Sequence, residues 1–229
     1  MTDRYRVLPG DPADDRIVLL DREGFERLRV HDGTEDGLTP GHVVEATVDW
    51  DGEATVRSAT VHTPTRYEFA AGVTGLFEAA RRTHREAVAA GDGMNSRVTY
   101  GTDGKPNGAV YTFAEPPGAD LLAAFRSGER PLDPLVDRAG EATEDGPREV
   151  FVLRPADDPF VAVAIAIDAD GLLADTIRDT YDLPRTGESL DLTARARDAD
   201  RPGVGDTDVL ADFDAPTTDE FEFGGDDGD

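Results

Sequence analysis

The sequence contains no cysteine and only one lysine, Lys105, among its 229 residues. Without cysteine, the chain has no disulfide bonds and no zinc site built from thiolates. Long apolar runs are also missing. The longest, residues 160–167, has the length of a strand, whereas a membrane-spanning helix needs about 20 apolar residues. Residues 1–6 lack the apolar core of a signal peptide. These absences predict a cytoplasmic protein that makes no membrane contact.

Negative charge dominates the composition of the chain. The chain has 49 acidic residues against 23 basic ones, which gives a formal net charge of -26. Such a charge opposes compaction by self-repulsion in dilute buffer. At molar salt the Debye length falls to roughly 3 Å, so this repulsion is screened. The Asp-rich, Lys-poor composition resembles that of proteins from extremely halophilic archaea and predicts a halophilic archaeal protein. An ordinary acidic protein from a GC-rich organism is the alternative.

The first third of the chain has the pattern of a small all-β unit. Short runs of β-forming residues are separated by turn-forming ones, and Asp51-Gly52 has the composition of a tight hairpin turn. The pattern predicts five strands at residues 4–8, 17–20, 25–30, 42–50 and 54–61. Five short strands of this kind predict an OB-like β-barrel over residues 1–66.

Residues 67–185 combine helical and strand patterns and predict an α+β domain. Apolar positions in residues 73–89 recur at helical spacing, and shorter helices are predicted at 119–126 and 172–181. Two hairpins are predicted, one from residues 97–100 and 109–113 and one from 149–154 and 160–168. The fold class is therefore predicted as α+β, with hairpins alternating with helices.

Residues 186–229 are acidic and show little periodicity, so a disordered acidic tail is predicted. Near its end, Phe221 and Phe223 stand between acidic residues. This spacing is compatible with a short segment that docks on protein partners. A purely solvating tail is the alternative interpretation.

One short pattern suggests catalysis. Asp168 follows an apolar strand and Asp170 comes two residues later, which resembles the first motif of haloacid-dehalogenase-type phosphatases. There the first carboxylate attacks phosphorus and the second is the acid or base. That family also needs a downstream lysine, and none follows Lys105. A strand, a turn and an aspartate that caps the helix at 172–181 explain the same residues and are preferred. An unrecognised hydrolase such as a phosphoesterase stays open as an alternative.

No catalytic residue, metal site or cofactor is predicted. The four histidines, His31, His42, His62 and His84, lack metal-ligand spacing, and His84 lies within the apolar stripe of its helix. A structural role is therefore favoured for them.

The predicted barrel offers a possible nucleic-acid surface. Barrels of the OB type bind single strands by stacking bases on exposed aromatic rings while arginines follow the backbone. The residues that fit these roles are Tyr5, Phe25, Arg27, Arg29, Trp50 and Arg57. The competing interpretation is that the arginines pair with local carboxylates such as Glu26, Asp32 and Glu45. A binding or accessory protein is the leading functional prediction, and a structural or dimerising module is its main alternative.

The order of segments is similar to that of an uncharacterised haloarchaeal family of unknown function. The similarity rests on the Tyr-Arg-Val-Leu start at residues 5–8, the segment Leu-Thr-Pro-Gly-His-Val-Val-Glu-Ala-Thr-Val-Asp-Trp at residues 38–50, the central helix and the acidic tail. It covers most of residues 1–185. The resemblance implies a haloarchaeal source and a protein class without an assigned activity. It supplies no catalytic residues.

The surplus of carboxylates leads to a test of salt dependence. We expect the chain to unfold cooperatively in molar KCl and to swell or lose cooperative unfolding in dilute buffer, because only dissolved ions screen the repulsion. Thermal unfolding followed by circular dichroism, with light scattering for size, would measure this. Equal compactness and cooperativity in both solutions would rule the expectation out.

Overall fold

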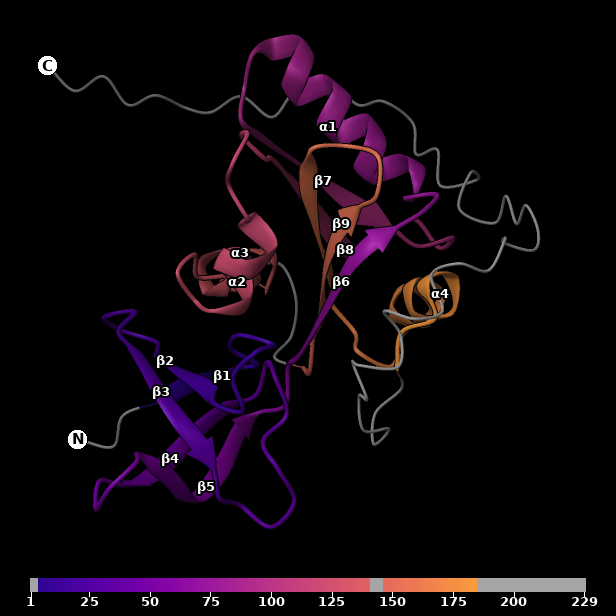
Figure 1. The fold of residues 1–229 in the computed structure, drawn as a ribbon. Coiled ribbons are helices and arrows are strands. Elements are labelled where there is room, and N and C mark those ends of the chain that lie inside the picture. The colour runs from indigo at the N-terminus through magenta and orange to yellow at the C-terminus, as the bar shows by residue number, and fades with distance from the viewer. Residues whose placement is uncertain (1–3, 141–145, 185–229) are drawn as a thin grey trace, which may run out of the picture.

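The N-terminal part of the chain forms a closed barrel of five strands. The computed structural model describes residues 4–140 and 146–184 (Figure 1). The barrel strands are β1 (Arg4–Leu8), β2 (Ile17–Asp21), β3 (Arg27–Asp32), β4 (Val43–Asp49) and β5 (Thr55–Thr63). Their order is β1-β2-β3-β5-β4, and the pairing of β1 with β4 closes the barrel. Strands β3 and β5 run parallel, whereas the other pairs are antiparallel. The predicted five-stranded barrel is confirmed.

Alternation of side chains along each strand fills the barrel. The fully buried interior is built from one valine or leucine of each strand: Val7, Leu19, Val30, Val44 and Val56. Successive side chains of a strand point to opposite faces, so the neighbours of these residues lie outside. Gly52 in the β4–β5 turn has a φ of 102°, a conformation that glycine adopts without strain.

Phe25 differs from the prediction. It was expected at the start of the third strand, but β3 begins at Arg27 and Phe25 lies in the preceding turn with a φ of 55°. The turn is held by Asp21, whose carboxylate accepts a hydrogen bond from the Gly24 backbone and whose carbonyl accepts one from the Phe25 backbone. These local bonds take the place of strand pairing at this position.

A second sheet follows the barrel. Its strands are β6 (Arg66–Val73), β7 (Met94–Tyr100), β8 (Pro106–Ala114), β9 (Glu149–Pro155) and β10 (Phe160–Ala166), in the order β6-β9-β10-β8-β7. The two predicted hairpins are confirmed as the antiparallel pairs β7–β8 and β9–β10. Strand β6, which pairs in parallel with β9, was not predicted. Its last residue, Val73, had been assigned to the following helix.

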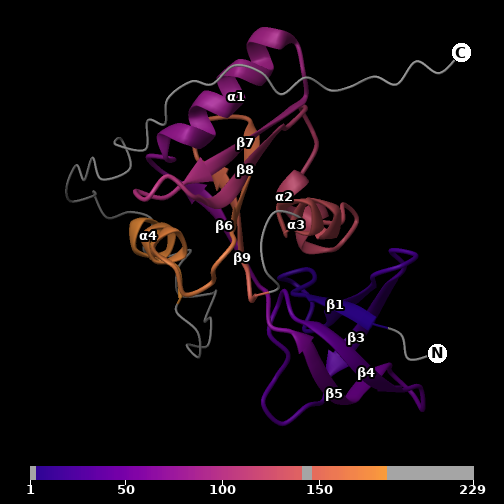
Figure 2. The same cartoon turned by 180° about the vertical axis from the view of Figure 1, so that it is seen from behind.

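Helices cover both faces of this sheet. The four helices of the described residues are α1 (Glu78–Ala90), α2 (Leu121–Arg126), α3 (Asp133–Gly140) and α4 (Leu172–Tyr181). Helices α1 and α4 lie on one face, while α2 and α3 lie on the other, between the sheet and the barrel (Figures 1 and 2). None of these helices is long and apolar enough to cross a membrane. The predicted acidic tail at 186–229, with its docking segment, lies outside the described residues.

One hydrophobic cluster joins the barrel to the second sheet. Leu8, Val18 and Leu20 point outward from the barrel and pack in the same cluster as Phe125 of α2. The approach is close at Gly128, just after α2, where a Cβ atom would lie 2.7 Å from Cδ1 of Leu8. We call this contact region between the barrel and the α2–α3 pair the seam.

Buried ion pairs cross the seam. Arg6 of β1 donates to Oδ1 of Asp133, the first residue of α3, at 2.7 Å, and both residues are only 2% exposed. Arg22, from the β2–β3 turn, contacts the same Oδ1 atom at 2.9 Å and Asp137 at 3.0 Å. A buried charge that loses its partner is costly, so these contacts constrain how α3 sits on the barrel.

Substitution of Asp133 tests this constraint. Asp133→Ala should lower the free energy of unfolding by about 3–5 kcal/mol, because it leaves the buried Arg6 guanidinium without its counter-charge. Equilibrium urea unfolding in molar KCl would measure the change. The double variant Arg6→Met/Asp133→Leu should recover part of the loss, since apolar groups of similar size can replace a buried pair.

The matched control is Asp49→Ala, which removes the partner of Arg57 in a solvent-accessible pair. This variant should unfold almost as the wild-type protein does. If Asp49→Ala and Asp133→Ala were equally destabilising, the seam pair would have no special role.

Candidate functional site

The outer face of β3 carries two exposed arginines. Leu28 and Val30 point into the barrel, so Arg27 and Arg29 point outward. Within residues 4–140 and 146–184, no hydrogen bond or ion pair engages either guanidinium group. The charge of Arg29 acts only at longer range: the pKa of Asp14 is lowered first by its hydrogen bond from Arg16 and, to a smaller extent, by Arg29.

Two of the three carboxylates in the competing interpretation, Asp32 and Glu45, make other contacts. Asp32 accepts hydrogen bonds from Thr34 and from the Leu38 backbone. Glu45 lies 3.4 Å from His62. The competing interpretation of the sequence, in which local carboxylates neutralise Arg27 and Arg29, is therefore not what the structure contains.

Two exposed aromatic rings flank β3 along its length. Phe25 lies just before the strand, in the left-handed conformation that a bulky residue rarely adopts. Trp50 is 64% exposed in the β4–β5 turn. That turn reaches the far end of β3, because Oε2 of Glu53 lies 3.2 Å from Nε2 of His31. The structure thus places Phe25, the two arginines and the turn that carries Trp50 along one strand.

The other two predicted site residues have different surroundings. Tyr5 is half-buried and packs against the barrel interior, so its ring belongs to the core. Arg57 donates to Oδ2 of Asp49 at 2.7 Å, and it lies just past the end of β3, since Asp32 is level with Val56. The pKa of Asp49 is lowered by a hydrogen bond from the Asp51 backbone and by Arg57.

Acidic side chains and packing limit this surface on two sides. Asp15 and Glu53 both lie within ion-pair distance of His31 at the end of β3. The outward side chains of β2, Val18 and Leu20, are covered by the seam. The face available to a ligand is therefore narrow and follows β3 itself.

The pair of aspartates that resembles a phosphatase motif is used in a turn. Oδ1 of Asp168 accepts a hydrogen bond from the Asp170 backbone at 3.0 Å, and the Asp168 carbonyl accepts one from Gly171. Asp170 faces Arg66 at 3.3 Å. The predicted aspartate cap of the following helix is wrong, because the N-cap of α4 is Gly171 and no side chain caps it. A turn explains the two carboxylates without a reaction.

Beneath this turn lies a buried ion-pair network that the sequence did not reveal. Glu149, which is 1% exposed at the start of β9, pairs with Arg178 of α4, and Arg66 lies 3.8 Å away from it. Arg178 also donates to the Ala169 carbonyl at 2.9 Å. Each charged group has a partner, so the network serves to hold α4 against the sheet.

In the described part of the chain, no group of three His, Asp or Glu side chains could hold a metal ion. His84 stacks on Phe160 with a ring distance of 4.0 Å, and burial lowers its pKa. His84 thus contributes to the packing of α1 against β10.

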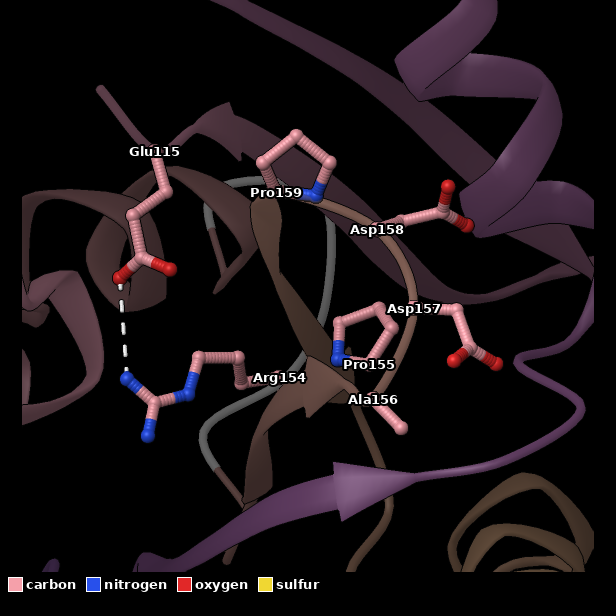
Figure 3. Close-up of a pocket in the computed structure, with 7 residues that line it drawn as sticks. All are labelled: Glu115, Arg154, Pro155, Ala156, Asp157, Asp158 and Pro159. Carbon is pink, nitrogen blue, oxygen red and sulfur yellow. Dashed lines mark ion pairs between the residues drawn. The ribbon is translucent and has the colours of Figure 1, made fainter. Parts of the chain in front are cut away.

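A shallow pocket of about 370 Å³ lies at the β9–β10 turn. Figure 3 shows Arg154 facing Glu115 on one side of the turn, with the carboxylates of Asp157 and Asp158 pointing away on the other. Arg154 also pairs with Asp120 at 3.1 Å. The charged groups of this pocket therefore do not converge on a ligand position.

Comparisons with known proteins place the chain in a family without assigning an activity. No curated protein matches it. No solved structure matches it either. A family model, described as a family of unknown function (DUF6663), matches residues 1–186, which include the barrel and the second sheet with its helices. The chain therefore belongs to the DUF6663 family of unknown function.

Proposed function

We propose that this chain is a binding protein whose OB-like barrel contacts single-stranded nucleic acid along the outer face of β3. The main support is that Arg27 and Arg29 are exposed without an ion-pair partner in the described residues, although acidic residues outnumber basic ones by more than two to one. Water solvates an exposed guanidinium group, so these two arginines can remain unpaired at little cost and stay accessible to the phosphates of a ligand.

The spacing along β3 suits an extended ligand. Arg27 and Arg29 lie about 7 Å apart, because alternate residues of a strand share a face. Phe25 precedes them, and the β4–β5 turn with Trp50 lies beyond them. Stacking of a base on an aromatic ring contributes about 1–3 kcal/mol and does not depend on base identity. Binding without sequence preference is therefore the expected mode.

The proposal includes a halophilic, archaeal and cytoplasmic setting. At molar salt the release of counterions contributes little to binding. Stacking on Phe25 and Trp50 then has to supply most of the affinity, while the arginines orient the backbone.

Substitutions on β3 and beside it test the proposal. In molar KCl, Phe25→Ala should weaken the binding of a labelled single-stranded oligonucleotide about tenfold or more, as expected for the loss of one stacking contact. Arg27→Ser/Arg29→Ser should also weaken binding and should reduce its salt dependence. Fluorescence anisotropy would measure the affinity, and Trp50 emission would report whether the strand reaches the β4–β5 turn.

Arg57→Ser is the matched control, because Arg57 is already paired with Asp49 and should contribute little. The proposal fails if the wild-type protein leaves the anisotropy of the oligonucleotide unchanged in both dilute and molar salt. It also fails if the Arg57 variant loses as much affinity as the β3 variants.

A dimerising module is a second candidate, favoured by the edge strand β7. Met94, Val98 and Tyr100 are each 40–49% exposed on one face of this strand, which pairs only with β8 among the described strands. Exposed edge strands with apolar side chains promote pairing with another chain. Antiparallel pairing of two β7 strands about Val98 would set Arg97 opposite Thr99 of the second copy, which avoids like charges.

Light scattering after size exclusion in molar KCl would test this second candidate. A dimer mass that Val98→Asp converts to a monomer mass is the expected result. Val88→Asp on α1 is the control and should leave the dimer intact, although Val88 is even more exposed than Val98. The backbone N–H of Ser96 in β7 already donates a hydrogen bond to the Asn95 side chain, so this group is not free to pair with a second copy. A monomer mass for the wild-type chain at all concentrations would exclude the candidate.

A further inference from the structure

A cavity of about 420 Å³ opens at the seam, away from the β3 face. Its walls come from the barrel, from α3 and from residues 146–148, which precede β9. The polar groups around it belong to Arg6, Arg22, His62, Thr63, Asp137 and Arg148. Cavities of roughly 300–1,000 Å³ are typical of small-molecule sites.

Arg148 is the unusual member of this set. It is 8% exposed, its Nε atom is fully buried without a hydrogen-bond partner, and no ion pair within residues 4–140 and 146–184 engages it. A buried charge without a partner costs several kcal/mol. In a chain with 49 acidic residues, a carboxylate would be the expected partner. Arg148 lies on the cavity wall, where an anion from outside can reach it.

The neighbouring charges leave a positive surplus in the cavity. Among the residues that line the cavity, three carry a guanidinium group (Arg6, Arg22 and Arg148) and one carries a carboxylate (Asp137), while Asp133 and Glu45 lie behind the wall as partners of Arg6 and His62. An anion that entered would meet more cationic than anionic side chains.

We propose that the seam cavity is a binding site for a phosphate group, either inorganic phosphate or the terminal phosphate of a phosphate monoester. The fork of N–H donors on a guanidinium group matches the oxygen atoms of phosphate in geometry and charge. Arg148 supplies the unengaged fork, Arg22 adds a second cation, and Thr63 and His62 offer further polar atoms at the wall. The site is separate from the β3 face and does not depend on it.

Thermal unfolding with added phosphate tests the site. In molar KCl, millimolar inorganic phosphate should raise the unfolding midpoint of the wild-type protein relative to a control with KCl at matched ionic strength. Titration calorimetry would give the affinity, which Arg148→Met should weaken roughly ten- to hundredfold, as expected for a lost charge-assisted contact. Arg148→Lys keeps the positive charge but lacks the guanidinium fork. Its affinity for phosphate should therefore fall between those of the wild-type and Arg148→Met proteins.

The unliganded Arg148→Met protein provides an independent signature. It should unfold at the same or a higher temperature than the wild-type protein without phosphate, because the substitution removes a buried unpaired charge. It should also lose the rise that phosphate causes. This combination separates loss of a ligand contact from loss of the fold. Arg138→Met, on the exposed side of α3, is the control and should keep the phosphate response.

Two oligonucleotides distinguish the sources of the phosphate group. If a 5′-phosphorylated strand stabilises the protein through Arg148 and its 5′-hydroxyl counterpart does not, the site takes a terminal phosphate. If inorganic phosphate alone gives the full effect, the site takes the free ion. The Arg27→Ser/Arg29→Ser protein should respond to inorganic phosphate as the wild type does. The proposal is overturned if phosphate has no effect on the wild-type protein, or an equal effect on Arg148→Met.

Discussion

The buried contact between Arg6 and Asp133 determines how the parts of this structure fit together. The Arg6 guanidinium also donates to the Gly41 carbonyl and lies 5.0 Å from the centre of the Tyr67 ring. One side chain therefore ties β1 to the β3–β4 connection, to β6 and to α3. Because a buried charge tolerates few alternative arrangements, the barrel and the second sheet are held in one relative position. The seam cavity lies between the parts that this contact joins.

The sequence predicted the local structure well where the pattern is short-range. Alternation along residues 42–50 and the Asp51-Gly52 turn predicted the β4–β5 hairpin. Strand β6 was missed because its partner, β9, lies about eighty residues further along the chain, and a parallel partner leaves no mark on local periodicity. Arg6 lies on the outside of the barrel, because its neighbour Val7 points into the interior. Alternation could not show that this outside face is covered by another part of the same chain.

The sequence predicted which residues form the candidate site on β3, but only part of their arrangement. The alternation of arginines with Leu28 and Val30 correctly placed Arg27 and Arg29 on one outer face. Phe25 was expected to share that strand, but local hydrogen bonds from the Asp21 turn hold it at positive φ instead. A strained bulky residue persists only where its surroundings fix it, and such residues are frequent at ligand sites. The departure from the pattern thus makes Phe25 a sharper candidate than the pattern alone did.

An unpaired arginine has a different meaning on the surface and in the interior. Water solvates the exposed guanidinium groups of Arg27 and Arg29, so their lack of partners costs little and gives modest support to a ligand. Arg148 is only 8% exposed, and its Nε atom is shielded from water without a hydrogen-bond partner. Asp137 lies at the same cavity wall, but within the described residues neither it nor another carboxylate pairs with Arg148. The cavity instead retains an excess of cations, which makes it the place in this acidic protein where an external anion has the clearest physical reason to bind.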